Sequence, residues 1–158
     1  MTIQIRKATF HDFPAIAPIA RESQELHAQA HPTIFANDTP GFSEDYLRHL
    51  IEDEQSDAYV AEEDGHIVGY AFLHVRPSSY LDIFQPQIVA SISDIAVTAP
   101  VRRKGIGQLL FDAAQQWAKS RNADRLELTV WEFNKNAIAF YERNSMETLS
   151  RTMSLPLT

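Results

Sequence analysis

The chain has 158 residues, of which 44% are hydrophobic, and its formal net charge at pH 7 is -7. We expect one domain over residues 1–158, because a chain of this length can bury a sizeable core. No apolar run approaches the ~20 residues of a membrane span, and the N-terminus does not resemble a signal peptide, so we expect a cytoplasmic protein without membrane contact. The acidic balance argues against nucleic-acid binding, which requires clustered lysine and arginine. The absence of cysteine excludes disulfides, thiolate metal sites and a cysteine nucleophile.

The hydrophobic periodicities predict strands and helices that alternate along the chain. Thr9 with Asp12 is typical of a helix-opening capping box, and Ser43 is placed to cap a second helix. The dipeptide Asp64-Gly65 separates two apolar segments, AYVAEE and HIVGYAFLHV, and this pattern predicts a β-hairpin. The predicted elements are, in chain order, a strand from Ile3 to Lys7, a helix from Thr9 to about Gln29, a helix after Ser43, the hairpin around Asp64-Gly65, a strand over Ile88 to Val97, a helix over Gly105 to Arg121, a strand over Arg125 to Trp131, a helix over Asn134 to Asn144, and a last strand near Met146 to Leu155. This order indicates an α/β fold with a mixed sheet flanked by helices.

Residues 101–110 read VRRKGIGQLL and place three cations and two glycines at the start of the helix near Gly105. A helix start carries unpaired N–H groups and about half a positive charge, so it binds phosphate groups well. The glycines allow an anion to approach the backbone, and the cations add to the field. From this segment alone, two interpretations stay open: an anion site, or a tight turn beside a solvated cationic surface. The segment matches neither the Walker loop nor the dinucleotide-binding glycine pattern.

A second segment, WEFNKNAIAFYERNSM at residues 131–146, decides between these interpretations. On a helix, it places Asn134, Ala137 and Tyr141 on one side. Together with VTAPVRRKGIGQLL, it closely resembles the GNAT superfamily of acetyl-CoA-dependent N-acyltransferases, and the resemblance covers essentially the whole chain. The residues that carry it are Val97, Arg102, Gly105, Gly107, Asn134, Ala137 and Tyr141. One departure is Ser145, which stands where the family often has glycine.

The resemblance implies a GNAT-like sheet that splays between the strands at 88–97 and 125–131, with acetyl-CoA as co-substrate at that place. Amides of residues 103–107 would hold the pyrophosphate, and the strand around Val97 would pair with the pantetheine arm. A backbone N–H near this residue would stabilise the developing oxyanion, and Tyr141 would protonate the departing thiolate. The implied contacts with the co-substrate are Ile95, Ala96, Val97, Arg102, Arg103, Lys104, Gly105, Ile106, Gly107, Asn134, Ala137 and Tyr141.

The acceptor amine must be neutral to attack, so a base or a water relay is needed. The resemblance implies Asp94, because some family members carry an acidic base at this place in the central strand. The alternative is that Asp94 only orders the strand or a neighbouring amide. Glu127, Glu132 and His74 are further candidates. The implied reaction moves the acetyl group directly from acetyl-CoA to a primary amine of a small molecule or peptide, in a ternary complex.

Acceptor selectivity is expected to lie in the proline-bounded loops at 31–42 and 76–87. Phe35 and Tyr80 in these loops, together with Trp131, are candidates to wall the acceptor pocket, and ordinary packing is the alternative for each. No motif in the sequence identifies the acceptor.

No metal site is expected, because His27 and His31 lie four residues apart without an evident third ligand. Two competing classes of function stay open: a non-catalytic acyl-CoA-binding sensor of the same fold, and a nucleotide-binding regulatory module. Retention of Tyr141 favours the enzyme over the sensor, and the absence of both nucleotide motifs disfavours the regulatory module. The resemblance also allows a homodimer, since homodimers are common in the family.

Overall fold

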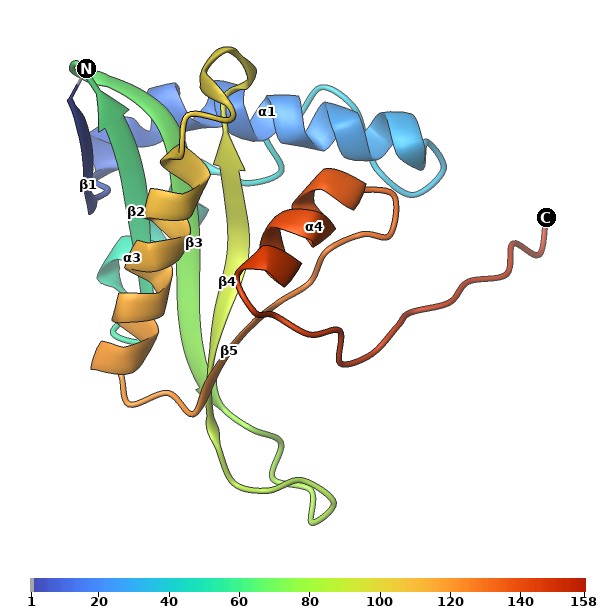
Figure 1. Cartoon of the computed structure of the whole chain (residues 1–158). Helices are drawn as coiled ribbons and strands as arrows, with labels where there is room; N and C mark the ends of the chain where they lie inside the picture. The colour runs from blue at the N-terminus through green and yellow to red at the C-terminus, as the bar shows by residue number, and fades with distance from the viewer. Residues whose placement is uncertain (1) are drawn as a thin grey trace. The chain divides into compact units, whose positions relative to one another are not determined.

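The computed structural model describes residues 2–158, which form two compact units that divide between Leu128 and Thr129. The first unit contains a β-sheet and three α-helices, and the second contains one α-helix (Figure 1). The elements are β1 (Ile3–Lys7), α1 (Phe13–Ala30), α2 (Glu44–Glu52), β2 (Ser56–Glu63), β3 (His66–Pro77), β4 (Ile88–Val97), α3 (Ile106–Ser120), β5 (Arg125–Leu128) and α4 (Lys135–Arg143), with short 3-10 turns at Phe10–Asp12 and Ala99–Val101. Among the described residues, no helix has the length and apolar character needed to cross a bilayer.

The five strands form one mixed sheet in the order β1-β2-β3-β4-β5. The first three pairings are antiparallel, and β4 pairs with β5 in parallel. This parallel pairing begins with Val89 opposite Arg125 and stops with Ile92 opposite Leu128. The predicted α/β fold with a mixed sheet is confirmed, and β4 continues to Val97 beyond its last pair with β5.

Local sequence signals determine the turns and helix starts. Asp64 and Gly65 have φ angles of 50° and 86°, as a tight hairpin turn between β2 and β3 requires. The Ser43 hydroxyl caps α2 by accepting a hydrogen bond from the N–H of Tyr46 at 3.2 Å. The Asp12 carboxylate accepts a hydrogen bond from the N–H of Thr9 at 2.7 Å. The predicted box therefore forms, although it opens a 3-10 turn and α1 follows directly after that turn.

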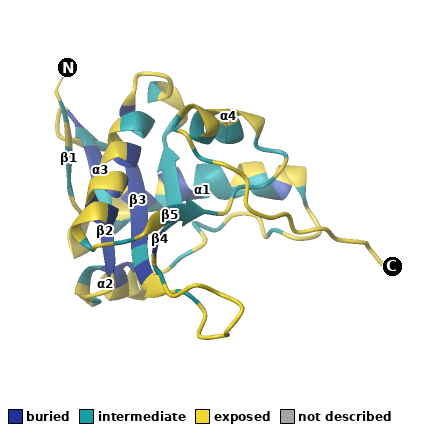
Figure 2. Ribbon diagram, turned by 60° about the horizontal axis from the view of Figure 1, so that its bottom comes forward, coloured by how far each residue is buried: buried dark blue, intermediate teal, exposed yellow. Residues whose placement is uncertain are grey.

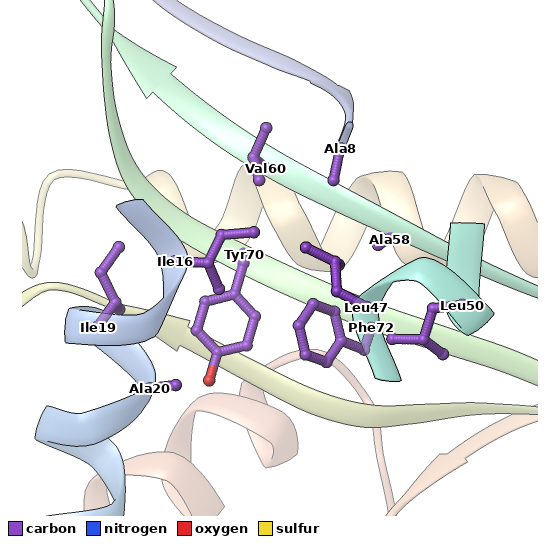
Figure 3. Close-up of a cluster of buried hydrophobic side chains, with 10 residues drawn as sticks. All are labelled: Ala8, Ile16, Ile19, Ala20, Leu47, Leu50, Ala58, Val60, Tyr70 and Phe72. Atoms are coloured by element: carbon purple, nitrogen blue, oxygen red, sulfur yellow. The ribbon is translucent and has the colours of Figure 1, made fainter. Parts of the chain in front are cut away.

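Helices cover both faces of the sheet in the first unit. Tyr70 and Phe72 project from one face of β3 into an apolar cluster that includes residues of α1 and α2 (Figure 3). Gly69 faces α3 on the other side, where a Cβ would lie 3.1 Å from Cδ1 of Leu110. Successive residues of a strand that is covered on both faces are all buried, and Val68–Leu73 follow this rule (Figure 2).

The second unit consists of α4 and its flanking segments, and none of its residues is buried (Figure 2). The helix ends in a Schellman turn: the N–H of Ser145 bonds to the carbonyl of Glu142, and the N–H of Met146 to the carbonyl of Tyr141, both at 3.0 Å. Ser145 has a φ of 68°, which favours glycine and costs another residue about 1 kcal/mol or more. The serine at the family's glycine position therefore keeps the turn at the cost of backbone strain.

Two predicted strands differ from the structure at the C-terminal end. β5 ends at Leu128, so the predicted extension to Trp131 is wrong. The strand predicted near Met146 to Leu155 is also wrong, because residues 146–158 adopt no regular secondary structure. A strand needs hydrogen bonds to a neighbouring strand, and within the described residues no strand pairs with this segment. Alternating apolar residues alone do not provide such a partner.

Candidate functional site

A β-bulge at Ser93 shapes the second half of β4. Phe72 and Leu73 are consecutive on β3, but they lie opposite Asp94 and Ile92 on β4. Ser93 is therefore the additional residue, and a bulge of this kind re-aims the side chains that follow it. Directly opposite residues share one face of a sheet. The bulge thus places Asp94 beside Phe72, on the face that α1 and α2 cover.

The carboxyl group of Asp94 contacts a tyrosine hydroxyl. Tyr70 is fully buried and donates its O–H to Oδ2 of Asp94 at 2.9 Å. Burial raises the pKa of Asp94 above its ordinary value, although hydrogen bonds from Tyr70 and from the N–H of Ile95, and the charge of His27, lower it. Burial and the charge of Asp94 raise the pKa of Tyr70 as well. A carboxyl group with a raised pKa is suited to exchange a proton nearer to neutral pH.

Asp94 borders a cavity of about 400 Å³. The ring centroid of Phe42 lies 5.1 Å from that of Phe72 and 6.3 Å from that of Tyr46. The residues that line the cavity are Gly41, Phe42, Ser43, Tyr46, Phe72, Ser93 and Asp94. Asp94 is the charged member of this set, so the cavity combines aromatic walls with one carboxyl group.

The second half of β4 has one open edge. β4 pairs with β3 as far as Val97, which lies opposite Gly69, whereas its pairing with β5 stops at Ile92. Beyond that residue, no strand in the described part of the chain pairs with the edge opposite β3. An edge of this kind can bind an extended ligand through backbone hydrogen bonds. This is the segment, Ile95–Val97, to which the sequence resemblance assigned the pantetheine arm.

The loop between β4 and α3 is anchored by Glu22 of α1. This carboxylate accepts hydrogen bonds from the hydroxyl of Thr98 at 2.7 Å and from the N–H of Ala99 at 3.0 Å. Arg102 donates from Nε to the carbonyl of Val97 at 2.8 Å, and its Nη2 lies 3.8 Å from Oε1 of Glu22. The Arg102 side chain therefore ties the loop to the end of β4.

The start of α3 is open to a ligand. Gly105 precedes the helix with a φ of 84°, and a Cβ at this residue would meet no protein atom within 4 Å. Arg103 and Lys104 are exposed beside it. The N–H groups of the first helical turn, at Ile106 and Gly107, have no intrahelical acceptor. Cations and open N–H groups fit a phosphate-bearing group such as the pyrophosphate of coenzyme A.

The aromatic residues expected to wall the pocket lie at several places. Tyr80 is 96% exposed in the loop after β3. The Phe35 ring packs edge-on against His27, with 5.0 Å between centroids. Neither residue is among those that line the cavity at Asp94. Trp131 is half-buried and belongs to the second unit.

The other candidate bases already have partners. Glu127 lies 2.8 Å from Arg76 and 3.3 Å from Arg125, Glu132 lies 3.5 Å from Lys135 and 3.4 Å from Arg151, and His74 shares a 3.0 Å hydrogen bond with the hydroxyl of Ser56. Glu127 and His74 are also not among the residues that line the cavity at Asp94.

The remaining predicted residues, Asn134, Ala137 and Tyr141, belong to the second unit. Asn134 caps α4, because its Oδ1 accepts a hydrogen bond from the N–H of Ala137 at 3.2 Å. Tyr141 is half-buried, and its ring lies 5.4 Å from that of Phe140. The contacts of these residues with a ligand stay predictions.

The histidine pair has ordinary helix contacts. His27 shares a 2.8 Å hydrogen bond through Nδ1 with the carbonyl of Ser23, and His31 is the C-cap residue that follows α1. Among residues 2–158, no group of three or more histidine, aspartate or glutamate side chains is arranged to hold a metal ion.

Sequence reasoning missed the residues that surround Asp94. Tyr70 and Phe72 occupy alternate positions of β3, Phe42 precedes the cap residue of α2, and Tyr46 lies in the first turn of that helix. Their spacing alone is typical of core packing, and no motif connects them with Asp94. Glu22 was missed for the same reason, because it lies 76 residues before its partner Thr98.

The open strand edge is followed by a cationic glycine loop and a helix, the order that the resemblance to the GNAT superfamily implies. Comparisons with known proteins show the same family. Residues 19–146 match the model of the Acetyltransferase (GNAT) family. The uncharacterized N-acetyltransferase YhfO of Bacillus subtilis is 30% identical over 145 residues, which cover 92% of this chain and 90% of that protein. The chain therefore belongs to the GNAT acetyltransferase family. It is an acyltransferase.

Solved structures share the fold. The crystal structure of a mutant of the BH1408 protein from Bacillus halodurans has a TM-score of 0.93 and 30% identity, and the match covers 98% of this chain and 99% of that one. An aminoglycoside N-acetyltransferase, AAC(6')-Iy, in complex with CoA has a TM-score of 0.70 and 16% identity, and the match covers 98% and 94% of the two chains. At this identity the second likeness concerns the fold alone.

Proposed function

We propose that the protein transfers an acetyl group from acetyl-CoA directly to a primary amine of a small molecule or peptide, in a ternary complex. The observation that carries the proposal is the carboxyl group of Asp94, which has a raised pKa and borders a cavity on the strand with the open edge. The family supplies the acyl chemistry, and Asp94 supplies a place where the amine can lose its proton.

Asp94 is assigned as the base. An amine attacks only in its neutral form, and an alkylammonium group has a pKa near 10. In its charged form, Asp94 accepts the proton of the amine as the nitrogen attacks the carbonyl carbon of the thioester. A pKa nearer to the working pH makes this carboxylate a stronger base. Tyr70 is assigned as a positioning residue, because it contacts Asp94 through its hydroxyl and is not among the residues that line the cavity.

The open edge of β4 and the loop that follows it are assigned to acetyl-CoA. N–H groups of residues 103–107 and the cations beside them bind the pyrophosphate. The segment Ile95–Val97 binds the pantetheine arm, and one N–H of this segment stabilises the oxyanion, a contribution typically worth about 3 kcal/mol. Asn134 and Ala137 are assigned to the same co-substrate. The fold relative that is known with CoA supports this use of the fold.

Tyr141 is assigned as the general acid. The new bond between nitrogen and the acetyl carbon forms, the bond between that carbon and sulfur breaks, and sulfur leaves as a thiolate. Tyr141 donates a proton to this thiolate, whose parent thiol has a pKa of about 8.5. One proton thus moves from the amine to Asp94 and one from Tyr141 to sulfur. No acyl-enzyme is involved, in keeping with a chain that contains no cysteine.

Steady-state kinetics test the reaction. Acetyl-CoA is incubated with amines, amino acids, polyamines, aminoglycosides and peptides that have free N-termini, and the release of free thiol is followed. Direct transfer requires intersecting initial-rate patterns, and parallel lines or a trapped acyl-enzyme would overturn it. A non-catalytic acyl-CoA sensor would instead bind acetyl-CoA and release no thiol with any acceptor.

Two glycine variants test the binding site for acetyl-CoA. Gly105 and Gly65 both have positive φ angles, 84° and 86°, and a Cβ at either would meet no protein atom within 4 Å. Gly105→Ala and Gly65→Ala therefore introduce similar backbone strain. We expect only Gly105→Ala to weaken acetyl-CoA binding, by about tenfold or more, because its Cβ occupies the place where the pyrophosphate approaches. Equal affinities of the two variants in calorimetry would reject the assignment.

A further inference from the structure

The cavity at Asp94 is built from three aromatic rings at different depths. Phe72 is 1% exposed and forms the deep end, whereas Tyr46 is 40% exposed and lies toward solvent. Phe42 contacts both rings, and the centroids of Tyr46 and Phe72 are 6.2 Å apart. A cavity of about 400 Å³ with aromatic walls is within the usual range for small-molecule sites.

The charge that lines the cavity is negative. Asp94 is its charged lining residue, and neither lysine nor arginine contributes to the lining. His27, whose charge acts on Asp94, is not among the lining residues either. A ligand carboxylate inside the cavity would therefore lie beside another carboxyl group without a lining cation to compensate it, which is costly in a partly buried place. An ammonium group is attracted by the carboxylate and by aromatic ring faces. An apolar carrier group gains contact area against the same rings.

We propose that this cavity is the acceptor subsite and that it selects primary amines attached to an aromatic or other apolar group without a carboxylate. The inference rests on the proposed acetyltransferase function. The amine lies at Asp94, and the carrier lies against Phe42, Tyr46 and Phe72. Phenethylamine represents this class, because it joins one ring to one amine through a short alkyl chain.

The same geometry disfavours two other classes of amine. An α-amino acid brings a carboxylate to the immediate neighbourhood of Asp94. A polyamine brings a second ammonium group into the region of the cavity that Phe42 and Phe72 line, where no second carboxylate is present in the lining. Desolvation of that charge is not compensated by an ion pair.

A matched pair of acceptors tests the selection. Phenylalanine and phenethylamine carry the same ring and amine and differ in the carboxylate. We expect phenethylamine to have a kcat/KM at least about 100-fold higher than phenylalanine, because like charges at close range cost several kcal/mol. Its kcat/KM should be higher than that for spermidine as well. Equal kcat/KM values for phenethylamine and phenylalanine would overturn the inference.

A matched pair of variants places the acceptor in the cavity. Tyr46 and Phe10 are each 40% exposed, but only Tyr46 lines the cavity. We expect Tyr46→Ala to raise the KM for phenethylamine by about tenfold and to leave the KM for acetyl-CoA unchanged. Tyr46→Phe keeps the ring and should restore most of the affinity, and Phe10→Ala should change neither KM. Equal effects of Tyr46→Ala and Phe10→Ala would overturn the placement.

Direct binding separates this inference from the proposed function. If no amine is acetylated, the proposed function fails, and calorimetric titration of phenethylamine into the protein then decides the inference. Binding that is weakened by Tyr46→Ala and not by Phe10→Ala supports the subsite. The inference is overturned if phenethylamine does not bind or if it binds equally to both variants.

Discussion

Asp12 lies between β1 and α1, and Asp94 lies in the second half of β4. The partner of the first carboxyl group is a cation, and the partner of the second is a neutral hydroxyl group. Asp12 accepts hydrogen bonds from Arg6 at 2.9 and 3.0 Å and from the N–H of Thr9 at 2.7 Å. The hydrogen bonds from Arg6 lower the pKa of Asp12, against the opposing effect of burial. Asp94 accepts a hydrogen bond from the hydroxyl of Tyr70, and burial raises its pKa.

The comparison shows how the partner of a carboxyl group determines its use. A guanidinium group favours the charged form, so Asp12 stays ionised and can serve the fold through fixed hydrogen bonds. A phenol hydroxyl stabilises the charged form less than an opposite charge does, so the effect of burial prevails at Asp94 and its pKa is raised. The comparison therefore separates the structural role of Asp12 from the chemical role proposed for Asp94.

The largest expected effect is on the activity of Asp94→Asn. Loss of the base should lower turnover by about 10² to 10⁴ at low pH, where little free amine exists, with partial recovery as the pH rises and the amine loses its own proton. Acetyl-CoA affinity should be nearly unchanged. Asp12→Asn is the control and should retain turnover per folded molecule. A pH–rate profile of Asp94→Asn that parallels the wild-type profile would remove Asp94 as the base.

The next effect is on the stability of Asp12→Asn. Removing the charge that Arg6 binds should lower the free energy of unfolding at neutral pH by about 1 to 3 kcal/mol, measured by denaturant unfolding. Because the pKa of Asp12 is lowered in the folded state, its contribution is present above the ordinary value of 3.8 and is lost as the pH falls below it. The difference between wild type and variant should thus shrink in acid. If the difference in the free energy of unfolding between wild type and Asp12→Asn stays the same from neutral to acidic pH, the lowered pKa of Asp12 is contradicted.

These two sites also differ in how far the sequence could predict them. The bond between Thr9 and Asp12 was predictable, because it joins residues three apart in a known helix-start pattern. The bond between Tyr70 and Asp94 joins residues 24 apart and depends on the bulge at Ser93. Nothing in the sequence VASISDIAV marks that residue as additional, since the register is determined by the pairing with β3. The carboxyl group itself was found only through the family resemblance.

The difference between local and long-range contacts also explains which predictions of the fold are correct. Turns and helix caps depend on a few neighbouring residues, and Asp64-Gly65 and Ser43 behave as predicted. The strand expected near Met146 to Leu155 depends on a partner elsewhere in the chain, and alternation could not supply it. The cavity depends on rings from α2 and β3 that meet only in the folded chain, so sequence reasoning placed its aromatic candidates in the loops instead.

A smaller effect, of opposite sign to that of Asp12, is expected for the stability of Asp94→Asn. The pKa of Asp94 is raised in the folded state, so wild type loses stability as the pH rises from the ordinary carboxyl value through the folded-state value. Asparagine can still accept the hydrogen bond from Tyr70 and carries no charge. The melting temperature of Asp94→Asn relative to wild type should therefore increase between about pH 4 and pH 8. A relative melting temperature that decreases over this range would contradict the raised pKa.

The smallest expected effect is that of Tyr70→Phe, which removes one hydroxyl and keeps the ring that packs against Phe72. The hydrogen bond from Tyr70 lowers the pKa of Asp94, so its loss should raise that pKa further. The acidic limb of the pH–rate profile should therefore move to higher pH, with little change in turnover on the plateau. Tyr59→Phe is the matched control, because Tyr59 is a half-buried tyrosine of the neighbouring strand β2 whose pKa is also raised by burial. If Tyr70 had only a structural role, Tyr70→Phe would lower the stability of the protein and leave the acidic limb at the wild-type pH. An acidic limb that stays at the wild-type pH in Tyr70→Phe, as in Tyr59→Phe, would mean that the group titrating in the rate is not the carboxyl group that Tyr70 holds.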